Sequence, residues 1–172
     1  MIWMKDISLL LILSMAVIMD FRNYKVPNPL IITGIFLGFI FSSLDTGLHG
    51  FSDALAGSVF PAAALMFFYR WSMLGAGDIK LFMVSGAFLG LRGSIESIIF
   101  SLFIGAAISL TLLIKYQILI ERLKYFSNYI NHVIKLHHMD TYYDLKQPKK
   151  GETLHFSLCI LLAAGVFLAF FR

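Results

Sequence analysis

Six long apolar segments dominate the chain and constrain its fold more than any other feature. They contain few charged residues, and they cover residues 6–20, 29–44, 52–69, 79–92, 94–115 and 154–171. Lipid offers no partner to backbone groups outside a helix or a closed barrel, and no alternating pattern of about ten residues favours a barrel. The sequence therefore predicts an all-α polytopic membrane protein with about six transmembrane helices.

The composition supports a membrane protein and excludes several other classes. Hydrophobic residues make up 59% of the chain and charged residues only 14%, whereas soluble domains have roughly a quarter charged residues. The one cysteine, Cys159, excludes an internal disulfide framework and a multi-thiolate metal site. We expect no metal and no cofactor. The formal net charge of +4 is interpreted as basic cytoplasmic loops rather than as a surface for nucleic acid.

The distribution of basic residues predicts the orientation in the membrane. Eleven of the fourteen lysines and arginines lie in the connections between spans one and two, three and four, and five and six. These eleven are Arg22, Lys25, Arg70, Lys80, Lys115, Arg122, Lys124, Lys135, Lys146, Lys149 and Lys150. We expect the protein in the cytoplasmic (inner or plasma) membrane. By the positive-inside rule, the three basic connections face the cytoplasm and both termini face the outside.

The stretch 116–152 is the only long hydrophilic part of the chain. Its first half has apolar residues at helical spacing, with charged residues between them. This pattern predicts an amphipathic helix that continues from the fifth span or lies along the inner leaflet. We therefore expect one membrane-embedded domain over residues 1–172, with 116–152 as a cytoplasmic insert.

Pairs of glycines at small-xxx-small spacing occur in two of the apolar segments. Gly34 and Gly38 form one pair, and Gly86 and Gly90 form the other. Such spacing is typical of helices whose backbones approach closely in a membrane. The sequence predicts tight helix packing at both places.

Two aspartates stand at span boundaries on the predicted cytoplasmic side. Asp20 ends the first span, and Asp78 opens the fourth. Because both lie at the same face of the bilayer, they can meet although they are far apart in the sequence. Each alone could be a helix-end charge, and Asp78 would be a favourable anion at a helix N-terminus.

The residues beside the two aspartates indicate a more specific use. Gly75 and Gly77 precede the second aspartate, and we expect them to allow close approach and a positive φ. Pro27 and Pro29 prevent a helix from continuing after the first aspartate. Both acids therefore stand next to backbone whose conformation is suited to something other than crossing the membrane.

A pair of carboxyl groups in this setting suits peptide hydrolysis. Two carboxyls within a few ångströms cannot both ionise, so that the pair shares a proton. One carboxylate takes a proton from water while the other, protonated, polarises the scissile carbonyl. No Ser-His pair, catalytic cysteine or HExxH motif competes for this role. Glu152 and His155 lack zinc-site spacing and are interpreted as loop and interface residues.

The two aspartate blocks resemble a known family. Residues 75–80, Gly-Ala-Gly-Asp-Ile-Lys, match the GxGD signature of membrane aspartyl proteases, and the lysine and leucine that follow resemble prepilin leader peptidases. Residues 20–22, Asp-Phe-Arg, followed by Val-Pro-Asn at 26–28, look like the first catalytic block of that family. The resemblance covers nearly the whole chain, and the short length is similar to the tight-adherence (Flp) pilus branch.

The resemblance implies an aspartic endopeptidase that removes the short basic leader of type IV or Flp-like pilin precursors at the cytoplasmic face. Asp20 and Asp78 would be the catalytic pair. The supporting residues would be Gly75, Gly77, Lys80, Arg22, Pro27 and Asn28.

The sequence also departs from the family pattern. Larger members carry a cysteine-rich cytoplasmic insert and methylate the new N-terminus, whereas this chain has one cysteine and no such insert. N-methylation is therefore not expected. Many relatives have a proline-rich motif at the start of the last span, where this chain has Gly-Glu-Thr-Leu-His-Phe-Ser at 151–157.

Two other classes of function remain open on the residues alone. Carboxylates in a membrane could serve a transport or proton-relay protein. Alternatively, the aspartates could be structural charges in a non-catalytic assembly scaffold. A precursor substrate and the bilayer are the expected partners.

Overall fold

The computed structural model describes residues 2–23, 25–71, 73–115 and 155–171. The chain divides into two compact units, which are Met1–Ile104 with His155–Arg172, and Gly105–Leu154. The structure describes residues 105–115 of the second unit, which are the last part of the helix that ends at Lys115. The amphipathic segment expected at 116–152 lies outside the described residues, and the single domain stays a prediction.

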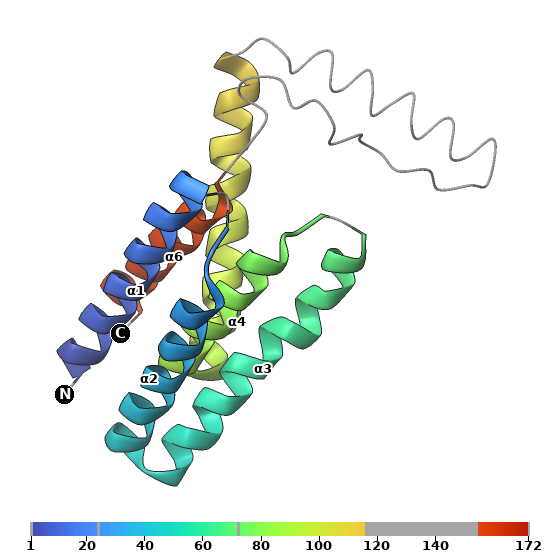
Figure 1. Cartoon of the computed structure of the whole chain (residues 1–172). Coiled ribbons are helices and arrows are strands. Elements are labelled where there is room, and N and C mark those ends of the chain that lie inside the picture. Colours follow the sequence, from blue (N-terminus) through green and yellow to red (C-terminus); the bar gives the residue numbers. More distant parts are fainter. Residues whose placement is uncertain (1, 24, 72, 116–154, 172) are drawn as a thin grey trace. The chain divides into compact units, whose positions relative to one another are not determined.

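All regular structure in the described part of the chain is helical (Figure 1). The helices are α1 (Ile2–Asn23), α2 (Asn28–Thr46), α3 (Leu48–Arg70), α4 (Ala76–Lys115) and α6 (Phe156–Phe170). Three of them, α2, α3 and α4, are long and apolar enough to cross a membrane, and α6 is a shorter apolar helix. The prediction of an all-α polytopic membrane protein is confirmed.

The described residues form five helices, whereas the sequence predicts six spans, and the expected segments 79–92 and 94–115 fall within one element, α4. This element is not a straight rod, since Gly90 within it has φ 74° and ψ −175°. A methyl group placed on Gly86 would lie 3.0 Å from Oγ of Ser94, although residues eight positions apart are separated by about 12 Å along a straight helix. The chain therefore turns back at Gly90, as Figure 1 shows where the green part of α4 gives way to the yellow part.

Proline and glycine determine where the other helices begin and end. Pro27 precedes α2 with φ −68° and ψ 137°, and Pro29 lies in the first turn. Proline fits these positions because it lacks a backbone N–H, and an N–H in the first turn of a helix would have no acceptor within the helix. Gly47 joins α2 to α3 with φ 62°, a left-handed value that other residues rarely adopt. Consequently, α2 and α3 lie side by side.

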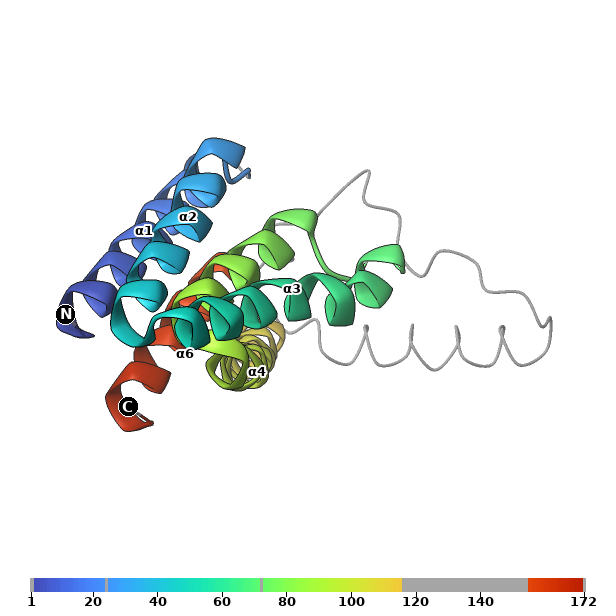
Figure 2. The same ribbon diagram turned by 90° about the horizontal axis from the view of Figure 1, so that it is seen from below.

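Helices α1 and α6 pack together, as do α1 and α2 (Figure 2). Their contact faces and the first half of α4 form the apolar core. Its fully buried large side chains are Leu9 and Leu13 of α1, Leu81, Phe82, Val84 and Phe88 of α4, and Ile160 of α6.

Small residues bring α2 and α3 close to α4, as the glycine spacing predicts. A methyl group on Gly38 would lie 2.7 Å from Cβ of Ala87, and the same group on Gly34 would also meet a side chain of α4. A methyl group on Gly86 would overlap the backbone of Gly57. Close approach of these backbones therefore depends on the absence of side chains.

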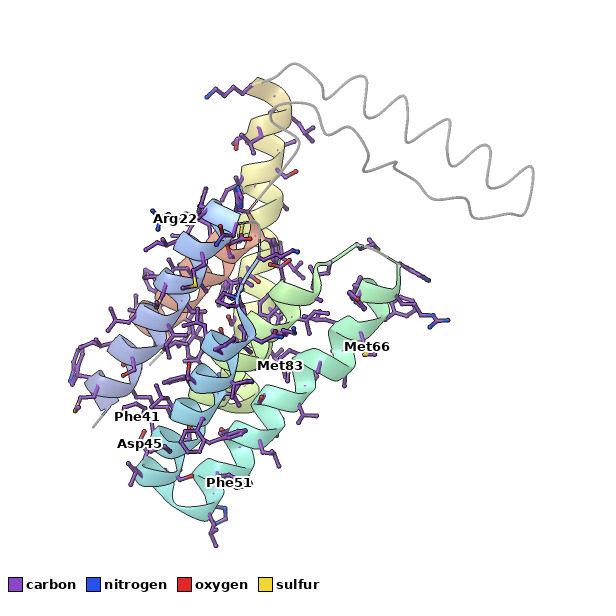
Figure 3. All side chains as sticks on the ribbon, viewed as in Figure 1. Arg22, Phe41, Asp45, Phe51, Met66 and Met83 are labelled. Atoms are coloured by element: carbon purple, nitrogen blue, oxygen red, sulfur yellow. The ribbon has the colours of Figure 1, made fainter. Side chains whose placement is uncertain are left out.

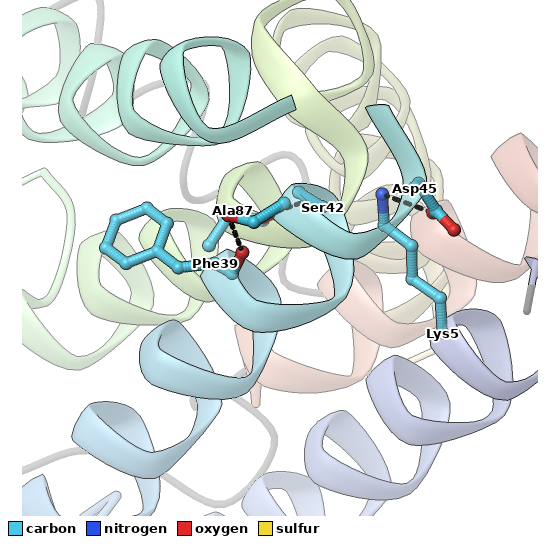
Figure 4. Close-up of polar contacts among 6 residues, drawn as sticks. Lys5, Phe39, Ser42, Asp45 and Ala87 are labelled. Atoms are coloured by element: carbon cyan, nitrogen blue, oxygen red, sulfur yellow. Dashed lines mark hydrogen bonds and ion pairs between the residues drawn. The ribbon is translucent and has the colours of Figure 1, made fainter. Parts of the chain in front are cut away.

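One end of the first unit is fixed by polar contacts between helices. Nζ of Lys5 lies 3.5 Å from Oδ2 of Asp45 (Figure 4). In the same region, the hydroxyl of Ser42 donates a hydrogen bond of 3.0 Å to the carbonyl of Ala87. Both contacts tie the C-terminal end of α2 to neighbouring helices. Since Lys5 lies near the start of α1, this end is opposite to the one that carries Asp20.

Candidate active site

Asp20 is placed by the periodicity of α1. Leu9, Leu13 and Ala16 are fully buried, and Asp20 follows them at the spacing that keeps residues on one helix face. The helix continues only to Asn23, so the carboxyl group stands at the end of the buried face. Its side chain is 18% exposed. A charged residue is thereby held at the rim of the apolar core rather than in solvent.

Asp78 is placed in the same way at the start of α4. It lies in the first turn of the helix, and Leu81 and Phe82, on the same face, are buried. The carbonyl of Gly75 accepts hydrogen bonds from the backbone N–H of Asp78 at 3.2 Å and of Ile79 at 3.4 Å. The Asp78 side chain is partly buried. The sequence thus directs the second carboxyl group toward the same core.

The structure brings the two aspartates together. Asp20 stands close enough to Asp78 for its charge to affect that carboxyl group, although 58 positions separate the two residues in the sequence. The pair joins the C-terminal end of α1 to the N-terminal end of α4. The prediction that the two carboxyl groups meet at one end of the bundle agrees with this geometry, whereas their catalytic role stays a prediction.

The glycines beside Asp78 do not have the expected conformation. Within the described residues, only Gly47 and Gly90 have a positive φ, so the prediction of positive φ at Gly75 and Gly77 is wrong. Gly77 already belongs to the right-handed first turn of α4, and a methyl group there would meet open space. Gly75 serves close approach instead, because a methyl group on it would lie 3.0 Å from Oδ2 of Asp78.

A hydrogen bond connects the two sequence blocks that carry the aspartates. Nζ of Lys80 donates to Oδ1 of Asn28 at 2.8 Å. Lys80 follows Asp78 in α4, and Asn28 begins α2 directly after Pro27. The contact links the start of α2 to the start of α4, next to the aspartate pair.

Arg22 has a different position from the other supporting residues. It is exposed at the end of α1 (Figure 3). Among the described residues, no hydrogen bond or ion pair joins it to either aspartate. The structure therefore does not bring Arg22 to the carboxyl pair.

Two residues at the N-terminal end of α6, the N-cap His155 and Ser157, contact Asp20, and sequence reasoning missed both. The hydroxyl of Ser157 donates a hydrogen bond of 2.6 Å to Oδ2 of Asp20. Nδ1 of His155 lies 3.3 Å from the same oxygen, and its ring packs on Phe21 with centroids 4.2 Å apart. The interpretation of His155 as a loop or interface residue does not include its contact with Asp20. The available signal was the pair of polar residues that opens the last apolar segment on the side of the aspartates.

Comparisons with known proteins identify the family. The model of the type IV leader peptidase family matches residues 7–110, a range that includes both aspartates and excludes α6. Comparisons with curated proteins and with solved structures found no match. Because the family match covers more than half of the chain and contains both aspartate blocks, the chain belongs to the type IV leader peptidase family.

Proposed function

We propose that the protein is an aspartic endopeptidase that removes the short basic leader of type IV or Flp-like pilin precursors. Its family indicates a peptidase. The observation that supports the mechanism is the proximity of Asp20 at the end of α1 to Asp78 at the start of α4, close enough for the charge of Asp20 to affect Asp78. A protein gains no stability from placing two acids near each other at the edge of an apolar core, whereas an aspartic peptidase uses such a pair.

In the proposed reaction, the two carboxyl groups act together on water and the scissile peptide. One carboxylate accepts a proton from water while the water oxygen forms a bond to the carbonyl carbon. The other, protonated, gives its proton to the carbonyl oxygen. When the tetrahedral intermediate collapses and the C–N bond breaks, the aspartate that took the proton from water gives it to the leaving amine. The other aspartate takes a proton back from a hydroxyl of the intermediate, which leaves the carboxyl product. The aspartates carry all the proton transfers, and no cofactor takes part.

The location of the pair fits a substrate with a basic leader and a hydrophobic helix. By the positive-inside rule, the basic connections favour an orientation with the aspartate end of the bundle at the cytoplasmic face and both termini outside. A precursor whose helix lies in the bilayer would present its leader junction at this face. The large exposed apolar side chains of the first unit include Leu11 at 65% and Phe36 at 63% exposure, and they are suited to lipid or to such a helix.

The test is cleavage of a candidate precursor co-expressed in membranes with the wild-type chain, Asp20→Asn or Asp78→Asn. Cleavage is read by gel shift, and the product is identified by N-terminal sequencing. Asp45→Asn is the matched control, because Asp45 also lies near a helix end but pairs with Lys5. We expect the wild type and the control to cut at the junction of leader and helix, and each site variant to lose at least about a hundredfold in rate.

The same experiment separates the other classes of function. A scaffold would tolerate both site substitutions, and a transporter would show an ion-dependent phenotype without a cleaved product. Equal cleavage by all four proteins would contradict the proposal.

A further inference from the structure

Helix α6 holds one oxygen of Asp20 from two directions. Oδ2 receives the hydroxyl of Ser157 at 2.6 Å and faces Nδ1 of His155 at 3.3 Å. These residues come from the last helix, 135 and 137 positions after Asp20 in the chain. They also lie outside residues 7–110, which match the family. The family match therefore assigns them no role.

Ser157 is a rigid donor. Its side chain is in the first turn of α6 and is only 1% exposed. The helix is fixed beneath it by Cys159, Ile160, Ala163 and Ala164, which are all fully buried. Because α6 packs along α1, the hydroxyl and the carboxylate have little freedom to move apart.

His155 is directed at Asp20 rather than at its own helix. It occupies the N-cap position of α6, but its side chain makes no capping hydrogen bond. Its ring packs on Phe21, the neighbour of Asp20, and its side chain is 17% exposed. The end of α1 is thus held by a hydrogen-bonding group and an aromatic contact from the same residue.

The two contacts leave the other carboxylate oxygen in a defined direction. Within the described part of the chain, Oδ1 of Asp20 has no hydrogen bond. A carboxylate fixed at one oxygen has a fixed orientation of the second, and geometry of this kind matters because small displacements of a reacting group cost large factors in rate. Supporting contacts commonly supply this precision.

We propose that Ser157 and His155 are positioning residues that fix Oδ2 of Asp20, so that Oδ1 is the oxygen that faces water and substrate. This proposal rests on the proposed function, because it assigns the orientation of an aspartate taken to be catalytic. It adds the N-terminal end of α6 to the site, in the place where many relatives carry a proline-rich motif.

The test is steady-state cleavage of a synthetic precursor peptide by the full chain in proteoliposomes. Ser157→Ala and His155→Ala remove the two contacts, and His155→Asn retains a donor near the position of Nδ1. The matched controls are Ser85→Ala and Ser101→Ala. Both serines are buried, and their hydroxyls donate within their own helix, to the carbonyls of Leu81 and Ile98.

We expect Ser157→Ala to lower kcat about ten- to a hundredfold, with KM unchanged, because a hydrogen bond to a charged group is lost. His155→Ala should have a smaller effect of the same kind, and His155→Asn should recover most of kcat. The control variants should keep the wild-type kcat. A purely structural role would lower the amount of folded protein without changing kcat, so each variant is also compared for thermal unfolding.

Asp20→Asn and Asp78→Asn in the same assay keep the two proposals apart. If both are inactive while Ser157→Ala and His155→Ala retain the wild-type kcat, the positioning proposal is overturned and the proposed function stands. If Asp20→Asn cleaves at the wild-type rate, the proposed function fails and the positioning proposal fails with it.

Discussion

The two ends of the first unit use aspartates in opposite ways. At the end that begins α1, Asp45 pairs with Lys5 at 3.5 Å. Asp53 accepts a hydrogen bond of 3.1 Å from the backbone N–H of Leu91, directly after the break at Gly90. At the other end, Asp78 stands close enough to Asp20 to be affected by its charge. The first two carboxylates each have a positive or donating partner. Asp20 also has one, in Ser157, but Asp20 and Asp78 in addition stand close to a second carboxyl group.

This difference separates stability from function. Asp53 satisfies a backbone group at the start of the second half of α4, which would otherwise lack a partner. Removing the Asp53 carboxylate should therefore lower the stability of the fold. Two neighbouring acids gain no stability from each other's charge, so we attribute their arrangement to the proposed catalysis. Replacing either one should remove activity without loosening the fold.

The largest effect is expected from the pair at the site. Asp20→Asn and Asp78→Asn should each lower the cleavage rate at least about a hundredfold, and the double variant should be no slower than the slower single variant, since groups that act as a unit are not additive. Rates of precursor cleavage in membranes measure this directly. Losses that multiply in the double variant would show that the aspartates act independently.

A smaller effect on activity is expected at the contact between the two sequence blocks. Lys80→Met and Asn28→Ala each remove the hydrogen bond of 2.8 Å that joins α4 to α2. Each should lower the cleavage rate by about tenfold, and the double variant should resemble the single ones, because contacting residues couple. Arg22→Ala is the control, since Arg22 is exposed at the same end. An equal loss in Arg22→Ala would show that charge near the membrane surface matters, rather than this contact.

The smallest effect is expected at the opposite end. Asp53→Ala removes the acceptor for the Leu91 N–H, and the loss of a helix cap costs about 1 kcal/mol. Thermal unfolding in detergent should show the decrease, while cleavage per folded molecule stays at the wild-type level. A decrease in cleavage with an unchanged unfolding temperature would contradict the assignment of a purely structural role to Asp53.

Much of the site end could be predicted because its signals are local. The apolar periodicity of α1 and the start of α4 place Asp20 and Asp78, and Pro27 marks the beginning of α2. The glycine spacing at Gly34 and Gly38 predicts close helix packing, and the structure identifies α4 as the neighbouring helix. Each of these inferences depends only on a short stretch of sequence and on the predicted orientation of that stretch in the membrane.

Other features depend on tertiary structure and could not be predicted in this way. Positive φ occurs at Gly47 and Gly90 and not at Gly75 and Gly77, because a glycine before a helix can also begin a right-handed turn. The contact of His155 with Asp20 joins residues 135 positions apart. No local spacing encodes it, since it depends on how α6 packs against α1.

The most direct test compares Asp→Asn variants at the two ends in one preparation. Precursor cleavage and thermal unfolding are measured for Asp20→Asn, Asp78→Asn, Asp45→Asn and Asp53→Asn in the same membranes. We predict that the first two lose cleavage and keep the wild-type unfolding temperature, and that the last two keep cleavage and unfold at the same or a slightly lower temperature. Cleavage retained by Asp20→Asn or Asp78→Asn, with a lowered unfolding temperature, would contradict the account and make that aspartate a structural residue.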